Sequence, residues 1–267
     1  MRYANLHTHT LFSDGKHTMR ENIESALNKQ MLSLGFSDHS FTACDPSYCM
    51  QPGQYGQYHA QLEALKQEYA HRIPIYTGME LDYFSEVDTA AYDYIIASVH
   101  YIIRGGECYP IDHSARQQKM CIRDAFGGNV WDMAACYFDI LTEHVTRVRP
   151  TVVGHFDVIT KFSLMPEATD RYRRIAADAL KQILAVCPYL EVNTGAIARG
   201  LKKLPYPSDY LLETARQCGA RIVLGSDSHH KDNLTFAFDE TVQLLQQLGF
   251  DSVHVFNGTG FDAMPIA

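Results

Sequence analysis

Short apolar runs in this chain end repeatedly on a histidine or a carboxylate. The run 3–6 leads directly into His7-Thr8-His9, and the run 221–225 leads into Asp227 and His229. The same arrangement recurs between these two ends, before His39, Glu80, His100 and His155. In a parallel α/β barrel the carboxyl ends of all strands lie on one face, so side chains that follow the strands meet there. Because imidazoles and carboxylates bind divalent cations, the pattern predicts a metal centre on that face.

The segments between these runs have the period of amphipathic helices. Apolar residues recur at helical spacing in residues 58–69, 130–148, 171–186, 208–218 and 238–248, and Thr18 and Glu21 have the spacing of a capping box. The apolar runs themselves are short and uninterrupted, as at 95–97 and 222–224, which is typical of strands covered on both faces. Strands and helices thus alternate. Polar residues follow nearly every strand, whereas in an open sheet they would cluster at one switch point. This predicts an α/β barrel rather than an open sheet.

Composition indicates one large domain over residues 1–267, since no linker divides the chain. The formal net charge of −8 argues against a nucleic-acid or anionic-membrane partner, and no run approaches the length of a membrane span. The seven cysteines include no Cys-x-x-Cys pair, so we expect a reduced, cytoplasmic protein whose cysteines are packing residues. The sequence carries no signal for an oligomeric state.

One segment interrupts the alternation of strands and helices. Residues 104–129 are polar and are punctuated by Gly105-Gly106 and Gly127-Gly128. We interpret this segment as a long loop between a strand and its helix, placed to cover the mouth of the site.

The candidate ligands divide into sets by their spacing. His7 and His9 lie two residues apart, so both side chains project to the same side and can hold one ion. Glu80 and Asp227 can complete such a site or bridge two ions, although either could instead cap the following helix. His100 and His155 make a second site if Glu80 is shared; each could otherwise be a hydrogen-bonded core residue.

A third set remains after these assignments. His17, His39 and His229 would suffice for a third ion, and Asp14 competes with His17 because Ser13-Asp14-Gly15 has the composition of a turn. The other histidines fall in predicted helices or loops and are expected to be surface residues: 59, 71, 113, 144, 230 and 254.

Several short motifs occur together in a fixed order along the chain. They are His7-Thr8-His9-Thr10 with Ser13-Asp14-Gly15, Ser37-Asp38-His39-Ser40, Gly78-Met79-Glu80, Ser98-Val99-His100-Tyr101, Gly154-His155-Phe156-Asp157 and Gly225-Ser226-Asp227-Ser228-His229. Over essentially the whole chain this order resembles the polymerase and histidinol phosphatase (PHP) superfamily, and is most similar to its monofunctional histidinol-phosphatase branch. The resemblance implies a distorted (β/α)7 barrel, similar to a TIM barrel, with up to three divalent ions.

The resemblance also implies a role for each ligand. One ion would lie on His7, His9, Glu80 and Asp227, and Glu80 would bridge to a second ion held by His100 and His155. The third would be held by His17, His39 and His229, with Asp14 as the alternative to His17. Such a ligand set accepts zinc, manganese or iron.

Two cations are placed to contact phosphate. Arg199 ends a stretch, 192–199, that resembles the phosphate-contacting loop of the same branch, and Lys161 follows Gly154-His155-Phe156-Asp157 closely. Taken as isolated residues, both would be solvated surface cations. Asp112, in the segment 104–129, is a candidate partner for a positively charged part of the substrate.

The motifs of other phosphatase mechanisms are absent. No cysteine is followed six positions later by arginine, and the chain has no Asp-x-Asp, no Arg-His-Gly and no phosphate-binding loop of the Gly-x-x-x-x-Gly-Lys type. This favours direct attack on phosphorus by a hydroxide held between metal ions through Glu80 and Asp227.

The expected function is therefore that of a phosphomonoesterase. The resemblance implies hydrolysis of L-histidinol phosphate in histidine biosynthesis, with a small-molecule phosphate ester as substrate and neither nucleic acid nor membrane as partner. The alternatives are another small phosphate ester or a nucleotide as substrate, a related metal-dependent amidohydrolase, and a non-catalytic metal-binding regulatory module. The amidohydrolase is disfavoured because no lysine ends a site-bearing strand.

Overall fold

Seven parallel strands form the centre of the protein in a computed structural model that describes residues 1–266. In spatial order they are β1 (Ala4–Asn5), β2 (Ser33–Phe36), β3 (Ile75–Asp82), β4 (Tyr94–Ser98), β7 (Val152–Val153), β8 (Tyr189–Asn193) and β9 (Arg221–Gly225). A parallel bridge between Thr8 and Ser228 joins the segments that follow the two outer strands. The sheet therefore curls into a nearly closed barrel, and the predicted α/β barrel is confirmed.

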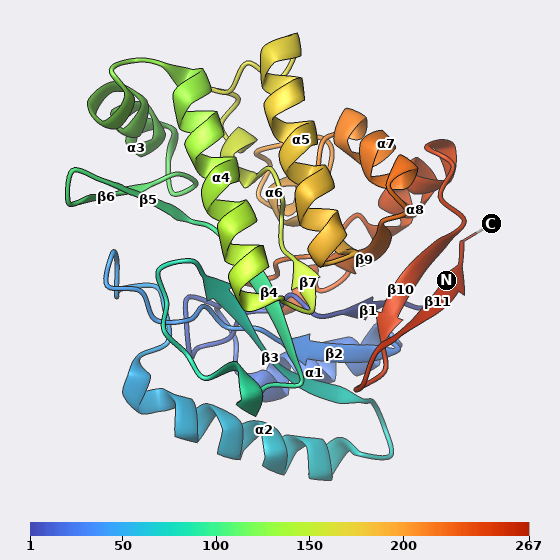
Figure 1. The fold of residues 1–267 in the computed structure, drawn as a ribbon. Helices are drawn as coiled ribbons and strands as arrows, with labels where there is room; N and C mark the ends of the chain where they lie inside the picture. The colour runs from blue at the N-terminus through green and yellow to red at the C-terminus, as the bar shows by residue number, and fades with distance from the viewer. Residues whose placement is uncertain (267) are drawn as a thin grey trace.

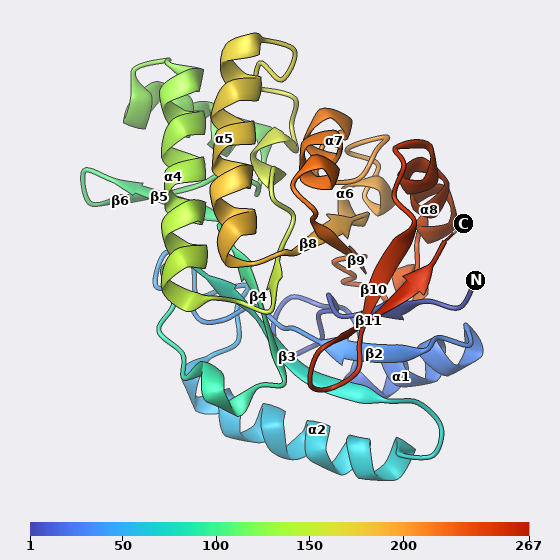
Figure 2. The ribbon, with the colours of Figure 1, turned by 45° about the vertical axis from the view of Figure 1, so that its right-hand side comes forward.

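Helices surround this barrel (Figure 1). They are α1 (Met19–Asn28), α2 (Tyr55–Tyr69), α4 (Val130–Val148), α5 (Asp170–Val186), α6 (Gly195–Ala198), α7 (Asp209–Gln217) and α8 (Phe238–Gln247). Helices α4 and α5 lie side by side, and α2 packs on β3 at the opposite flank (Figures 1 and 2). Thr18 and Glu21 form the expected capping box at the start of α1. The predicted helices are confirmed, with bounds that differ by three residues or fewer.

The interior of the barrel is filled mainly by one large side chain, Tyr94. Its ring is buried and packs with Leu6, Ile96, Val152, Val223 and Phe256. A β-carbon at Gly78 would lie 2.1 Å from the Tyr94 ring, and one at Gly35 would lie 2.4 Å from its hydroxyl oxygen. Glycine at these two strand positions is therefore explained by the space that the tyrosine needs.

A C-terminal hairpin covers the end of the barrel where the strands begin (Figure 2). It consists of β10 (Ser252–Phe256) and β11 (Phe261–Pro265), which pair antiparallel. The Phe261 ring stacks on Tyr189 with centroids 4.0 Å apart, and Phe256 contacts Tyr76 edge-on at 5.0 Å. This end of the barrel is closed by aromatic packing, so the opposite end is left for polar groups.

The segment predicted as a long loop has secondary structure of its own. It contains β6 (Glu107–Pro110), which pairs with β5 (Tyr101–Arg104), then α3 (Ala115–Met120) and a π-helical turn at Cys121–Ala125. The interpretation as a loop missed this hairpin, whose turn is formed by Gly105 and Gly106 with φ of 62° and 83°. Its position was correct, since the segment lies between β4 and α4.

The expectation that every cysteine is a reduced packing residue was also wrong. Cys44, in the loop after β2, forms a disulfide with Cys108 in β6, and the two are 64 residues apart in the chain. Sequence spacing could not reveal this pair because the contact depends on how the hairpin folds over the barrel. Of the free cysteines, Cys49, Cys121 and Cys187 are buried as expected. Among residues 1–266, no helix is long and apolar enough to cross a membrane.

The disulfide gives a prediction for stability. Replacement of Cys108 by Ser should lower the free energy of unfolding by about 2–4 kcal/mol, because the cross-link closes a long loop in the unfolded chain. Denaturant titration at fixed metal concentration measures the change, and Cys218→Ser, which removes an exposed free thiol, is the control. Equal unfolding midpoints for Cys108→Ser and wild type would contradict a stabilising disulfide.

Candidate metal centre

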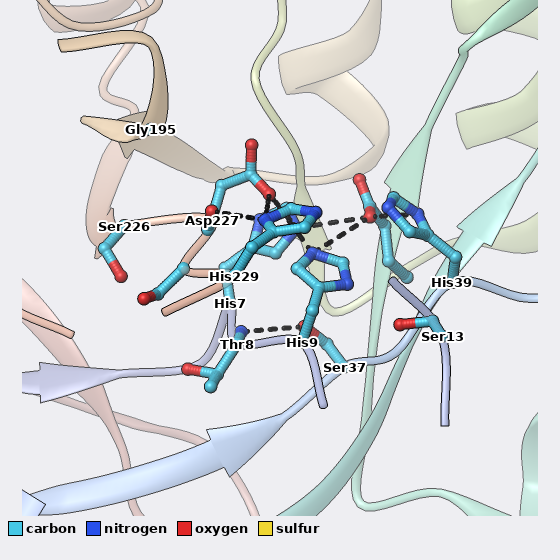
Figure 3. Close-up of polar contacts among 12 residues, drawn as sticks. His7, Thr8, His9, Ser13, Ser37, His39, Gly195, Ser226, Asp227 and His229 are labelled. Atoms are coloured by element: carbon cyan, nitrogen blue, oxygen red, sulfur yellow. Dashed lines mark hydrogen bonds and ion pairs between the residues drawn. The ribbon is translucent and has the colours of Figure 1, made fainter. Parts of the chain in front are cut away.

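The side chains that follow β1 and β9 meet because the bridge between Thr8 and Ser228 holds their backbones together. His9 N donates to Ser228 O at 2.9 Å, and Ser228 N donates to His7 O at 3.1 Å. In consequence, His9 Nε2 lies 3.1 Å from Asp227 Oδ1, and His7 Nε2 lies 3.7 Å from the same oxygen (Figure 3). These three groups form a buried cluster of the kind that can hold an ion.

Glu80 lies between two groups of imidazoles. Its Oε2 atom is 3.3 Å from His7 Nε2, 3.6 Å from His9 Nε2 and 2.7 Å from His39 Nδ1. Its Oε1 atom is 2.8 Å from His155 Nε2 and 3.3 Å from His100 Nε2. Glu80 is an internal residue of β3 rather than the residue after a strand, because β3 continues to Asp82. The two oxygens of one carboxylate thus face different ligand sets, which is the geometry of a bridging ligand.

The third set contains Asp14 and not His17. Asp14 Oδ1 lies 3.1 Å from His229 Nε2 and 3.7 Å from His39 Nε2, and the His9 ring stacks on the rings of both histidines. His17 instead faces Glu21, with Nδ1 3.4 Å from Oε1, and its ring lies edge-on to His230. The reason is local: Glu21 reaches back to cap α1 and lies beside His17. We therefore propose Asp14 as the ligand in place of His17.

Several buried atoms in these sets lack a hydrogen-bond partner within residues 1–266: His7 Nε2, His9 Nδ1, Asp14 Oδ1 and Glu80 Oε2. An unpaired buried polar atom is costly, and a bound cation would satisfy several at once. Imidazole nitrogens with carboxylate oxygens are a donor set that divalent transition metals accept. The residues present therefore fit a multinuclear metal centre, and we propose the three sets as its ligands.

The surroundings favour the deprotonated form of His9. Burial and the nearby rings of His229 and His39 lower the pKa of His9 to about 3, so its imidazole is neutral at pH 7 and can bind a metal. Burial alone would raise the pKa of Asp227, but the Arg199 guanidinium and the imidazoles around it hold that pKa well below its usual range.

Sequence reasoning missed the carboxylates that orient these ligands. Glu191, inside β8, lies 2.6 Å from His7 Nδ1, and Asp82 accepts from His100 N at 3.0 Å and lies 3.2 Å from His100 Nδ1. The available signal was a charged residue within an apolar strand, as in Leu190-Glu191-Val192. A buried charge at such a position needs a partner, and here the partner is a ligand ring.

A cavity of about 440 Å³ opens over the metal centre. Arg199 and Lys161 both line it, and each is paired with a carboxylate. Arg199 Nη2 lies 2.5 Å from Asp227 Oδ2, and Lys161 Nζ lies 3.0 Å from Asp112 Oδ2. His113 and His230 are exposed, as expected of surface residues, and both also line this cavity. His144 was also expected at the surface but is buried and contacts Leu81 O through Nε2. The other wall of the cavity carries Tyr48 and Tyr101.

Comparison with known proteins identifies the family. A model of the PHP domain matches residues 5–195. The chain belongs to the PHP domain family. A "Probable histidinol-phosphatase" of Deinococcus radiodurans is 28% identical over 91% of this chain and 92% of its own length. The histidinol-phosphatase of Bacillus subtilis is 27% identical over 87% of this chain and 96% of its own.

Solved structures agree on the PHP fold. A crystal structure of histidinol phosphate phosphatase from Lactococcus lactis, in complex with Zn, L-histidinol and phosphate, superposes with a TM-score of 0.73. It covers 98% of this chain and 99% of its own, at 20% sequence identity. The match extends beyond residue 195 and therefore includes β9 and α8, the last parts of the barrel.

The choice between Asp14 and His17 can be tested by metal content. Asp14→Ala should lower the bound metal by about one ion per chain, because it removes an oxygen ligand that faces two imidazoles. His17→Ala should retain the wild-type content, since its partner Glu21 lies outside the cluster. Elemental analysis after gel filtration measures both. Loss of metal from the His17 variant alone would reverse the assignment.

The proposed bridge predicts a larger defect at Glu80. Glu80→Gln keeps the side-chain shape but removes the charge that both imidazole sets share, so occupancy should fall at two positions. Its metal content should lie below that of Asp14→Ala, measured in the same way. A content equal to wild type would show that Glu80 does not bridge.

Proposed function

We propose that this PHP protein is a metal-dependent phosphomonoesterase that hydrolyses L-histidinol phosphate to L-histidinol and inorganic phosphate. The observation that carries the proposal is the position of Glu80, whose two oxygens face separate imidazole sets directly below a cavity lined by Arg199 and Lys161. The names of the curated relatives in Bacillus subtilis and Deinococcus radiodurans support the choice of substrate.

The metal ions would be held by His7, His9, Glu80 and Asp227, by Glu80, His100 and His155, and by Asp14, His39 and His229. Divalent cations at such a site supply Lewis-acid activation of water and of the phosphoryl group. Zinc is supported by the Lactococcus lactis complex, and manganese or iron would suit the same ligands.

The cations of the cavity would bind the substrate's phosphate. Arg199 presents a planar fork that matches two phosphate oxygens, while Lys161 supplies a compact charge. Both are already paired with carboxylates, and these pairings fix their side chains before substrate arrives. Asp112 lies beside Lys161 on the same wall and would face the ammonium or imidazole of the amino alcohol.

The rest of the proposal concerns the protein as a whole. We propose one domain over residues 1–267, a small-molecule partner rather than nucleic acid or membrane, and a cytoplasmic location. The net charge of −8 supports the exclusion of nucleic acid. The five free cysteines support a cytoplasmic location, whereas the disulfide between Cys44 and Cys108 counts against it. Hydrolysis of another small phosphate ester or a nucleotide is the second candidate, favoured by the size of the cavity, about 440 Å³.

Phosphate release tests the proposed activity. Protein loaded with zinc or manganese should release phosphate from L-histidinol phosphate, and chelator-treated protein should not until metal is restored. Adenosine monophosphate and an aryl phosphate, assayed in parallel, separate the candidate substrates. Higher kcat/KM on either of these would assign the second candidate, and no release from any ester with metal bound would favour a non-catalytic module.

Arg199 gives a quantitative prediction. Arg199→Ala should lower kcat/KM by about 10- to 150-fold through loss of a charge-assisted contact worth about 1.5–3 kcal/mol. Arg199→Lys should restore little, because an ammonium cannot reproduce the fork. Steady-state kinetics at saturating metal measure the loss. Unchanged kcat/KM in Arg199→Ala would leave Lys161 as the phosphate contact.

A further inference from the structure

Glu191 is a buried carboxylate below the candidate metal centre, and no substrate group is needed to explain it. It is the central residue of β8, 1% exposed, between Leu190 and Val192. Its Oε1 atom lies 2.6 Å from His7 Nδ1. Its Oε2 atom accepts from His155 N at 2.7 Å and from Asn193 Nδ2 at 2.9 Å. Each oxygen is thus occupied by a different segment of the barrel.

An ionised carboxylate only accepts hydrogen bonds, so its neighbours must donate. His7 Nδ1 therefore donates to Glu191, and Nε2, 3.3 Å from Glu80 and 3.7 Å from Asp227, is the ring nitrogen left to bind an ion. The hydrogen bond from His155 N to Glu191 fixes the backbone of His155, whose Nε2 atom faces Glu80 Oε1. One carboxylate therefore contacts a proposed ligand of the first ion and a proposed ligand of the second.

We propose that Glu191 is a positioning residue that holds His7 in its metal-binding tautomer and sets the position of His155, so that it couples the first two ion positions. This inference rests on the proposed metal ligands but not on the identity of the phosphate ester.

The strand next to β8 is shaped around this carboxylate. A β-carbon at Gly225, in β9, would lie 1.9 Å from Glu191 Oε1. Gly225 does not have a positive φ, so backbone conformation does not explain the glycine. The space that Glu191 needs does explain it, and this supports the same role from a different element.

Glutamine cannot replace Glu191 in either orientation of its amide. If its oxygen faces His7, its NH₂ group faces the N–H of His155, and two donors oppose each other. If its oxygen faces His155, its NH₂ group faces His7 Nδ1 and stabilises the tautomer whose Nε2 carries the proton. An amide oxygen that faces His7 therefore disturbs His155 and the second ion position. An amide oxygen that faces His155 disturbs His7 and the first ion position.

Zinc affinity, measured by competition with a chromogenic chelator, tests the proposal on the full-length protein. Glu191→Gln should weaken binding of the tightest zinc ions by about 10- to 100-fold, the range typical of groups that orient ligands. Asp157→Asn is the matched control: it neutralises another buried carboxylate, whose hydrogen bonds go to Ser208 and not to a ligand ring. The control should remain within about 3-fold of wild type.

Two further measurements distinguish loss of the positioning role from misfolding of the Glu191→Gln variant. Gly225→Ala should reproduce the loss of affinity without changing any charge, because its methyl group displaces Glu191. Nitrogen-15 NMR of the imidazoles in zinc-bound protein, with His7 assigned through a His7→Gln variant, should show the Nδ1–H tautomer in wild type and its loss in Glu191→Gln.

The outcomes separate this proposal from the proposed function. Wild-type zinc affinity in folded Glu191→Gln, an equal loss in Asp157→Asn, or an Nε2–H tautomer of His7 in zinc-bound wild-type protein would each overturn the positioning role. None of these measurements uses a phosphate ester, so failure to hydrolyse L-histidinol phosphate would refute the proposed substrate and leave this result standing.

Discussion

Closure of the barrel between Thr8 and Ser228 is the constraint on which the site depends. The two hydrogen bonds of this bridge bring together segments about 220 residues apart, and with them His9 and Asp227. β1, at one edge of the sheet, and β7, between β4 and β8, are only two residues long, so little regular pairing supports the sheet at these two strands. Packing around Tyr94 inside the barrel and aromatic packing of the C-terminal hairpin stabilise the barrel where these short strands form few hydrogen bonds. The site is therefore a product of the whole fold rather than of any one loop.

The charges around the centre are unusual for a protein interior. Glu80, Asp82, Glu191 and Asp227 are all buried, and burial of an ionised carboxylate costs several kcal/mol unless it is paired. Imidazoles partner them: against the effect of burial, these carboxylates raise the pKa values of His7, His39 and His100, whereas burial lowers the pKa of His9 to about 3. Bound cations would balance these carboxylates, so folding and metal binding are expected to be thermodynamically linked. The net negative charge of the chain is in part a consequence of this ligand set.

Most of the fold and most of the candidate ligand clusters could be predicted from the sequence. Strand-end histidines, helix periodicity and the capping box at Thr18 depend on local spacing, and these predictions agree with the structure. His17 was preferred to Asp14 because residue type was weighed without the geometry of the turn, in which Glu21 caps α1 and lies beside His17. Glu191 was overlooked because its function depends on a residue of another strand, which spacing along one strand cannot indicate. The hairpin β5–β6 and the disulfide were missed for the same reason, since both depend on long-range contacts.

The disulfide also bears on the cavity. Cys44 belongs to the loop that carries Tyr48, and Cys108 belongs to the hairpin that begins at Tyr101. The rings of these two tyrosines stack with centroids 6.2 Å apart on the cavity wall. A covalent bond thus ties together two surface segments that would otherwise move independently, and one cannot swing outward without pulling the other. The separation of these two parts of the cavity lining is therefore limited by chain connectivity as well as by packing.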